Sequence, residues 1–318
     1  MRSAIPAVVR VLGASLALAS LVLTSTAEGQ KLFKYQDANG VWVYTDRQPD
    51  TAQPYEQSKL TKRFEPPEVR LFQREDEAGI ALIAKNTFFA PIQLAYRLSQ
   101  MQNVAPSTPL DGFNVLPPRS ESQLLEVGRA VPGQETSFRY EFQFLPGEPG
   151  AEHHPQQPYR LPFALSSTVP VSQAFPDVIT HGDPSSQYAI DFVVPVGTHV
   201  FAAREGVVIE VASDFFEHGT NLKADGPRAN VVRVLHDDGT MSLYGHLNWN
   251  SIRVVPGQHV ARGEYLADSG NTGFTTGPHL HFVVQRNRGG ALVSVPVEFA
   301  GPGGAPVTVR TRESYTAR

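Results

Sequence analysis

The stretch Gly-Asn-Thr-Gly-Phe-Thr-Thr-Gly-Pro-His-Leu-His-Phe, residues 270–282, places two histidines two positions apart in a run that is typical of a β-strand. Side chains at positions i and i+2 of a strand point to the same face of a sheet. His279 and His281 therefore present two imidazoles side by side, behind a turn rich in Gly, Thr and Pro. Such a pair is a good beginning for a zinc site, provided that the chain supplies further ligands.

The composition favours a mainly β protein of about two or three domains. Of the 318 residues, 41% are apolar and 18% charged, as in ordinary globular proteins, and the 26 Gly and 26 Pro favour strands and turns over helices. The net charge of -4, without basic clusters, argues against nucleic-acid binding. Because the chain has no cysteine, any metal site must use His, Asp and Glu.

Residues 1–27 have the pattern of a secretory signal peptide. Two arginines precede the apolar run 11–23, and Ser25 and Ala27 place small residues at the spacing that signal peptidase reads. The alternative is an uncleaved anchor, but the run is shorter than the ~20 residues that span a bilayer. We expect cleavage after Ala27, export to the periplasm or cell envelope, and no membrane span once the signal is removed.

Turn-rich segments divide the rest of the chain. Residues 28–66 contain aromatic-rich strands around an Asp-Ala-Asn-Gly turn and predict a small β-hairpin module, which resembles one found at the N-termini of many exported bacterial proteins. Residues 70–145 carry several alternating apolar runs, the clearest at 138–144, and predict an immunoglobulin-like β-sandwich. Residues 146–165, rich in Pro and Gln, predict a linker.

Residues 166–300 are expected to form a compact antiparallel β barrel or sandwich, followed by a tail at 301–318. Gly-Thr-His-Val at 197–200 recurs as Gly-Gln-His-Val at 257–260, which indicates short strands joined by tight turns. Similar repeats occur in lipoyl- and biotinyl-type carriers, but the lysine available here, Lys223, lacks the flanking Met residues of that pattern.

Two further residues of this region could carry chemistry. Asp191 stands in an otherwise apolar strand, where a carboxylate is costly to bury without a partner, so it is a candidate metal ligand. The alternative is an aspartate at a strand edge in water. His246 follows a predicted strand, and a neutral imidazole beside a metal can act as general base or stabilise an oxyanion. The alternative is a histidine satisfied in the interior.

The order and spacing of several motifs resemble the lysostaphin/LytM-type zinc metallopeptidases, the peptidoglycan endopeptidases of bacterial envelopes. The resemblance covers residues 172–297. The matching pieces are Ala-Ile-Asp-Phe at 189–192, Pro-Val-Gly-Thr-His-Val and its continuation at 195–208, His-Asp-Asp-Gly at 236–239, Tyr-Gly-His-Leu at 244–247 and Gly-Pro-His-Leu-His-Phe at 277–282. This resemblance implies a mainly β peptidase domain with Zn2+ as its cofactor.

Carried over by position, the resemblance implies that Asp191 and His281 bind the zinc. It implies that His246 and His279 form the catalytic pair beside the metal, one as general base and one as stabiliser of the tetrahedral intermediate. Other histidines of the region, such as His236, are expected to be structural or exposed.

The first ligand departs from the family pattern. The family commonly has a histidine four residues before the ligand aspartate, where this chain has Gln187. We expect His181, ten residues before Asp191, to bind the metal instead, with residues 183–187 looped out. Asp183 is a weaker candidate, and loss of the ligand is the other alternative.

These residues predict a zinc metalloendopeptidase that hydrolyses peptide cross-links of bacterial peptidoglycan through a metal-activated water. The predicted partners are the peptide stems and cross-bridges of peptidoglycan, together with other envelope proteins. The alternative is a catalytically inactive LytM-like envelope factor that binds peptidoglycan or activates cell-wall amidases. Gln187 is the feature that keeps this alternative open.

Overall fold

The computed structural model describes residues 11–14, 31–36, 42–45, 54–59, 64–75, 79–177 and 179–318. The chain divides into two compact units, one of residues 17–65 and the other of residues 1–16 and 66–318. Most of the predicted signal peptide lies outside the described residues. Within the described part of the chain, no helix is both long and apolar enough to cross a membrane.

The smaller unit contains a sheet in the order β3-β2-β4. Its strands are β2 (Lys31–Gln36), β3 (Trp42–Thr45) and β4 (Glu56–Lys59). Strands β2 and β3 pair antiparallel, as a hairpin requires, although the predicted turn between them lies outside the described residues. Phe33 is buried and meets the Tyr55 ring edge to face at 5.5 Å.

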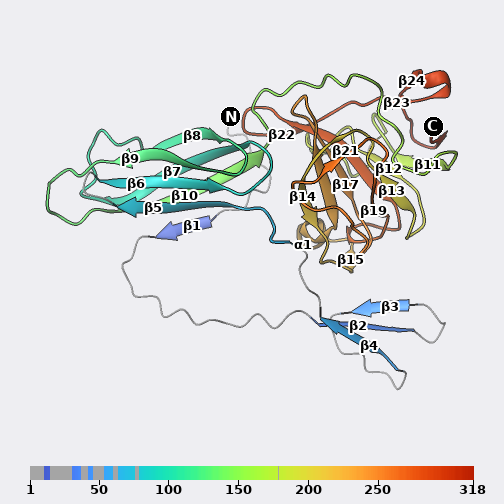
Figure 1. Cartoon of the computed structure of the whole chain (residues 1–318), viewed down its shortest axis with the longest axis horizontal. Coiled ribbons are helices and arrows are strands. Elements are labelled where there is room, and N and C mark those ends of the chain that lie inside the picture. Colours follow the sequence, from blue (N-terminus) through green and yellow to red (C-terminus); the bar gives the residue numbers. More distant parts are fainter. Residues whose placement is uncertain are drawn as a thin grey trace. The chain divides into compact units, whose positions relative to one another are not determined.

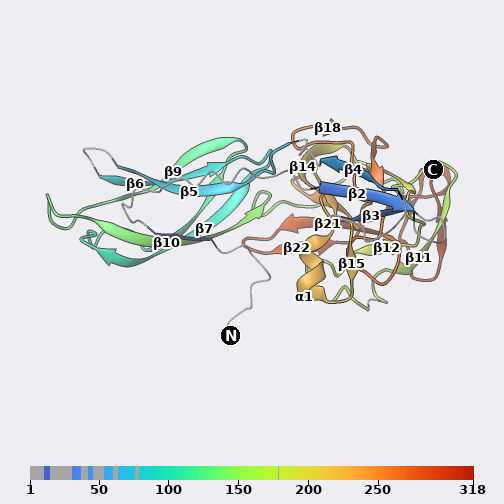
Figure 2. The same cartoon turned by 90° about the horizontal axis from the view of Figure 1, so that it is seen from below.

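Residues 66–146 form a β-sandwich whose two layers are visible in Figure 2. One sheet has the order β5-β6-β9 and the other the order β1-β10-β7-β8. The strands are β1 (Val11–Ala14), β5 (Val69–Glu75), β6 (Ile80–Asn86), β7 (Ile92–Gln102), β8 (Asp111–Leu116), β9 (Ser120–Val127) and β10 (Ser137–Pro146). Strand β1 falls inside the predicted signal peptide, so cleavage after Ala27 would remove it.

Alternation of apolar residues explains the sandwich. In β7, Ile92, Leu94 and Tyr96 point inward and are buried, whereas Ala95 between them is exposed. They share one core with residues of the facing sheet, such as Leu82. Burying these apolar side chains contributes about 25 cal/mol per Å2 and holds the two sheets together.

The C-terminal domain, residues 147–318, is built on a sheet in the order β18-β14-β16-β17-β21-β12-β11-β25, with β22 also paired to β21 (Figure 1). The strands of this sheet are β11 (Thr168–Gln173), β12 (Ile190–Phe192), β14 (Gly206–Ala212), β16 (Val231–Leu235), β17 (Met241–Gly245), β18 (His259–Val260), β21 (Leu280–Asn287), β22 (Leu292–Val295) and β25 (Ser314–Thr316).

Short elements complete this domain. They are the pairs β13 (His199–Phe201) with β19 (Tyr265–Asp268), β15 (His218–Gly219) with β20 (Gly273–Phe274) and β23 (Phe299–Ala300) with β24 (Pro306–Val307), the helix α1 (Leu222–Asp225), and 3-10 turns at Gly226–Arg228 and Pro302–Gly304. The chain is mainly β, as predicted, and the described strands form open, sandwich-like sheets rather than a closed barrel.

Two segments are more ordered than their composition indicated. Within the predicted linker 146–165, Tyr159, Leu161 and Phe163 are buried in the C-terminal domain. Within the predicted tail 301–318, strand β25 pairs with β11 and extends the central sheet. The first segment is held by alternating apolar side chains and the second by strand pairing, in both cases with partners far away in the sequence.

A buried polar cluster joins the first of these segments to the domain. Arg204 is 4% exposed and donates to Asp238 at 2.7 Å and to the Tyr159 hydroxyl at 3.3 Å. The ring of His236 meets Tyr159 edge to face, and its Nδ1 donates to the Glu205 carbonyl at 2.7 Å. Burial, only partly opposed by this hydrogen bond, lowers the pKa of His236 to about 4.

We predict that His236 makes the domain acid-sensitive. Between pH 6.5 and 4, His236 is protonated in the unfolded chain but not in the folded one. The free energy of unfolding therefore falls as the pH falls. His236→Gln, which can still donate to the Glu205 carbonyl, should remove about 3 kcal/mol from the loss of unfolding free energy between pH 7 and pH 4. Chemical denaturation at both pH values measures it. His199→Gln, at an exposed position, should change nothing; an equal acid loss in wild type and His236→Gln would refute the prediction.

Candidate active site

Strand pairing brings the polar side chains of the candidate site into one row. Asp191 on β12 lies opposite His281 on β21 and, on its other side, opposite Gln173 on β11. His281 in turn lies opposite Gly245, the last residue of β17. Directly opposite residues of antiparallel strands share a face, with Cβ atoms about 4.5–5.5 Å apart. The register alone therefore places the carboxylate beside the imidazole.

The neighbours of Asp191 explain why it points into this row. Ile190 and Phe192 are 4% and 0% exposed and anchor the opposite face of β12, where the Phe192 ring meets Phe163 edge to face at 5.3 Å. Asp191 itself is 8% exposed. A carboxylate buried to this extent needs partners, because an unpaired charge is expensive to remove from water.

His181 reaches the row from the loop between β11 and β12. The loop is bound to the sheet on the C-terminal side of His181, since the Ser294 hydroxyl donates to the Pro184 carbonyl at 2.9 Å. On β21, the Gln285 side-chain amide donates to the Ser185 carbonyl at 2.7 Å. His181 is 4% exposed, so this loop carries a buried imidazole into the site.

His181, Asp191 and His281 converge on one point. Nε2 of His181 lies 3.2 Å from Asp191 Oδ2, and Nδ1 of His281 lies 3.0 Å from Asp191 Oδ1. One potential ligand atom from each residue lies within 4.8 Å of the others. Neighbouring ligand atoms of a tetrahedral zinc are ~3.3 Å apart at normal bond lengths. Two imidazoles and a carboxylate fit zinc in donor type, and the two N–O separations fit its spacing.

The same contacts set the charge of Asp191. Burial by itself raises its pKa, but hydrogen bonds from His181 and His281, together with their charges, lower the pKa well below its usual value. Asp191 is therefore ionised at neutral pH. A permanent negative charge between two imidazoles attracts a cation to the space between the carboxylate and the ring nitrogens.

His246 and His279 form a second pair beside this group. Their ring centroids are 4.5 Å apart, and Nε2 of His279 lies 3.7 Å from Asp191 Oδ1. His246 follows the end of β17 with φ = 57°, in the left-handed region that non-glycine residues rarely adopt. This conformation turns the chain out of the strand and its imidazole toward His279. Such backbone strain is tolerated mainly where a site requires it.

Carbonyl groups fix the proton positions in this pair. Nδ1 of His246 lies 2.7 Å from the Thr272 carbonyl, and Nδ1 of His279 lies 2.8 Å from the Gly277 carbonyl. A carbonyl only accepts, so Nδ1 carries the proton in both rings and Nε2 keeps its lone pair. Burial, followed by the charges of His281 and His279, lowers the pKa of His246 to about 3, which keeps that ring neutral at pH 7.

These five residues lie along a cleft of about 340 Å3. Other parts of its wall come from a helix, a strand and a loop: Leu222 of α1, Phe274 of β20, and Thr275 after β20. The cleft is thus lined by one carboxylate and four imidazoles, together with apolar and hydroxyl groups.

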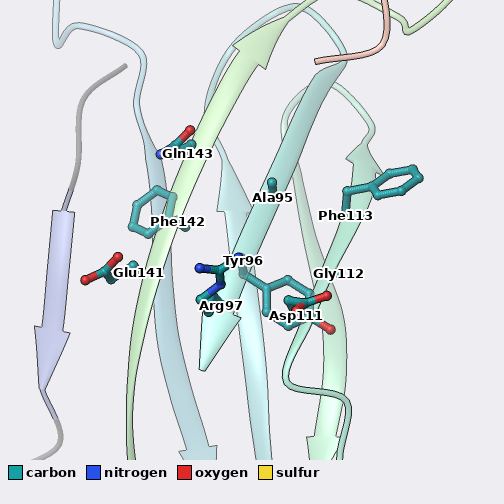
Figure 3. A pocket seen from close by; sticks show the side chains of 9 residues that line it. All are labelled: Ala95, Tyr96, Arg97, Asp111, Gly112, Phe113, Glu141, Phe142 and Gln143. Carbon is teal, nitrogen blue, oxygen red and sulfur yellow. The ribbon is translucent and has the colours of Figure 1, made fainter. Parts of the chain in front are cut away.

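A second hollow, of about 470 Å3, lies on the sandwich over β7, β8 and β10. In Figure 3 the side chain of Arg97 lies among those of Asp111 and Glu141, and Phe113 points away at the edge. The described residues that line this hollow include no histidine. The chemistry expected from the sequence therefore belongs to the cleft of the C-terminal domain.

Residues 185–292 match the model of peptidase family M23. This part of the chain is a peptidase M23 domain. The matched range contains Asp191, His246, His279 and His281, whereas His181 lies just before it. At the other end of the chain, residues 19–67 match a domain of unknown function, DUF4124.

The M23 domain is similar to several curated proteins. It is 39% identical over 93 residues to peptidoglycan DD-endopeptidase ShyA of Vibrio cholerae, covering 29% of this chain and 18% of ShyA. It is 31% identical over 96 residues to lysostaphin of Staphylococcus simulans, covering 30% of this chain and 17% of lysostaphin. The chain thus spans less than a fifth of the length of either relative. The solved catalytic domain of that lysostaphin is 27% identical over 38% of this chain and 81% of its own, with a TM-score of 0.28.

The structure brings together all the residues predicted for the site: His181, Asp191 and His281 as one group, His246 and His279 as its neighbours. Their roles as ligands and catalysts stay predictions. The weaker ligand candidate Asp183 is taken up in a turn, where its carboxylate accepts from the Ser185 amide at 2.8 Å, and it is exposed.

Sequence reasoning missed the residues that hold these five in place. Gln173 contacts Asp191, and the Thr272 carbonyl fixes the proton on His246. A backbone carbonyl leaves no signal in residue identity. Gln173 did leave a signal in the sequence. It is a polar residue at the end of the alternating run 168–173, at a position where the alternation predicts burial.

We predict the Nδ1–H tautomer for both His246 and His279 in the metal-free protein. Long-range 1H–15N spectra at pH 7.5 should show a pyrrole-type Nδ1 and a pyridine-type Nε2 in each ring, because the carbonyl partners accept only. His199, whose side chain is 66% exposed, should show averaged tautomers and is the control. An Nε2–H signal from His246 would contradict the assignment.

Proposed function

We propose that the chain is a zinc metalloendopeptidase that hydrolyses peptide cross-links of bacterial peptidoglycan. The single observation that carries the proposal is the convergence of His181, Asp191 and His281 beside the pair His246 and His279. The names of the relatives support the substrate class, since ShyA is a peptidoglycan DD-endopeptidase. The predicted signal peptide agrees with a place in the periplasm or envelope.

In this proposal His181, Asp191 and His281 hold the zinc ion. A zinc ion bound by three protein ligands supplies a Lewis acid that polarises the scissile carbonyl and makes water a better nucleophile. The donor set is two neutral imidazoles and one carboxylate, so the site keeps a net positive charge when loaded. Such a charge favours the oxyanion that develops when water attacks a peptide carbonyl.

The other two histidines handle protons. With Nδ1 donating to a backbone carbonyl, Nε2 of His246 or His279 is free to take a proton from the attacking water. The oxygen of that water forms the new bond to the carbonyl carbon, the peptide C–N bond breaks, and the proton returns to the leaving amine. The second ring takes a proton from bulk solvent at Nε2, donates it as a hydrogen bond to the oxyanion, and returns it to solvent when the products leave. The two rings lie close enough to act on one carbonyl.

The non-catalytic alternative rested on the loss of the ligand at Gln187. His181 stands beside Asp191 and His281, which supports the proposal that it replaces the histidine missing at position 187. The arrangement therefore favours catalysis over a purely binding role.

We predict that activity requires the metal and the imidazole pair separately. Wild-type protein should hold one zinc ion and clear a suspension of purified sacculi, and chelation should abolish clearing until zinc is restored. His181→Ala should lose zinc and activity together. His279→Ala should keep zinc but lose about 10^2–10^4-fold in kcat, because proton transfer is removed. Zinc content measures metal binding, and the turbidity of the sacculus suspension measures activity.

His199→Ala serves as the matched control, because that histidine is exposed and lies outside the cleft. It should leave zinc content and clearing unchanged. Equal clearing by wild type and His279→Ala would defeat the proposed function.

A further inference from the structure

Gln173 occupies a position that the proposed mechanism does not use. It is the last residue of β11, it is 5% exposed, and it lies directly opposite Asp191 in the register of β11 with β12. The loop that carries His181 begins soon after it. Gln173 thus stands between the strand of one proposed ligand and the loop of another.

Both ends of the Gln173 amide are fully engaged. Its Oε1 accepts from the backbone N–H of Ile179 and from that of Thr180, the latter at 2.8 Å. Its Nε2 donates to Thr180 Oγ1 and to Asp191 Oδ2, each at 2.9 Å. The two backbone donors must meet the oxygen, so the orientation of the amide is fixed and its NH2 group necessarily faces the carboxylate.

These bonds join two groups that the chain connects only loosely. His181 and Asp191 are ten residues apart, and a loop of that length allows the imidazole many positions before it is ordered. Ser294 and Gln285 bind the loop on the far side of His181. Gln173 binds the two residues immediately before His181. Unlike Ser294 and Gln285, it also contacts the Asp191 carboxylate.

The bond from Gln173 also restrains the Asp191 carboxylate. Oδ2 accepts from Gln173 and lies 3.2 Å from Nε2 of His181, while Oδ1 faces Nδ1 of His281 and Nε2 of His279. A hydrogen bond to one oxygen disfavours rotation of the carboxylate, so its remaining lone pairs stay directed at the imidazoles. Hydrogen bonds to metal-binding side chains typically change metal affinity by about 10–100-fold.

We propose that Gln173 is a positioning residue that binds the His181 loop to the Asp191 carboxylate and so holds two zinc ligands at coordinating distance. This role rests on the proposed function. A short spacing between two metal ligands fixes their geometry through the chain itself. With His181 and Asp191 ten residues apart, the hydrogen bonds of Gln173 take over that task.

The test compares three variants of the full chain. Gln173→Met keeps the size of the side chain and removes all its hydrogen bonds. Gln173→Glu keeps an acceptor for the amides of Ile179 and Thr180. Gln285→Met is the matched control, because Gln285 is also a buried glutamine, 6% exposed, and binds the same loop without touching a proposed ligand.

Two measurements are made on each variant. Zinc affinity, from competition with a chelator, should fall about 10–100-fold in Gln173→Met and less than about threefold in Gln285→Met. Hydrogen exchange at the Thr180 amide of the metal-free protein should accelerate in Gln173→Met and stay slow in Gln173→Glu. General loss of stability would affect both methionine variants alike, so the difference between them reports positioning.

The outcomes separate this role from the proposed function. Zinc binding by wild type, with Gln173→Met within threefold of it, would overturn the role of Gln173 and leave the metallopeptidase standing. Equal loss of affinity in Gln173→Met and Gln285→Met would also overturn it. A wild-type chain that holds no zinc at all would defeat the proposed function, and the role of Gln173 with it.

Discussion

The buried carboxylate of Asp191 is the constraint on which the site depends. A charge at 8% exposure in the middle of a sheet must be surrounded by donors, and the register of three strands supplies them on both sides. His281 comes from β21, Gln173 from β11, and His181 from the loop between β11 and β12. Satisfying this one group therefore assembles the proposed metal ligands around it.

The fold sets the remaining geometry through close approaches of the backbone. Gly270 pairs with His279 in an isolated bridge, and a Cβ at Gly270 would lie 2.6 Å from the backbone of Asn248. Only glycine fits there, so the turn that precedes His279 can press against the segment that follows His246. The strained φ of His246 belongs to the same arrangement, because it aims that ring at His279 rather than along the strand.

Local patterns were sufficient to predict much of the M23 domain. The two-residue spacing of His279 and His281 gives a common face on any strand, and an aspartate among apolar residues signals a buried partner. The linker and the tail were harder, because Tyr159 and β25 are stabilised by strands far away in the sequence. Gln173 shows both limits: the alternation of 168–173 predicts its burial, but its contact with Asp191 comes from the register of β11 with β12, which no local pattern encodes.

The spacing of ten residues between His181 and Asp191 could leave the His181 loop without a fixed structure. A ligand on a free loop would have to be ordered by the metal, and part of the binding free energy would be spent on that ordering. Here the loop is bound at Pro184 and Ser185 on one side of His181 and at Thr180 on the other. The imidazole is buried and faces Asp191. The ten-residue spacing therefore separates two proposed ligands along the chain while side-chain hydrogen bonds hold the loop to the sheet.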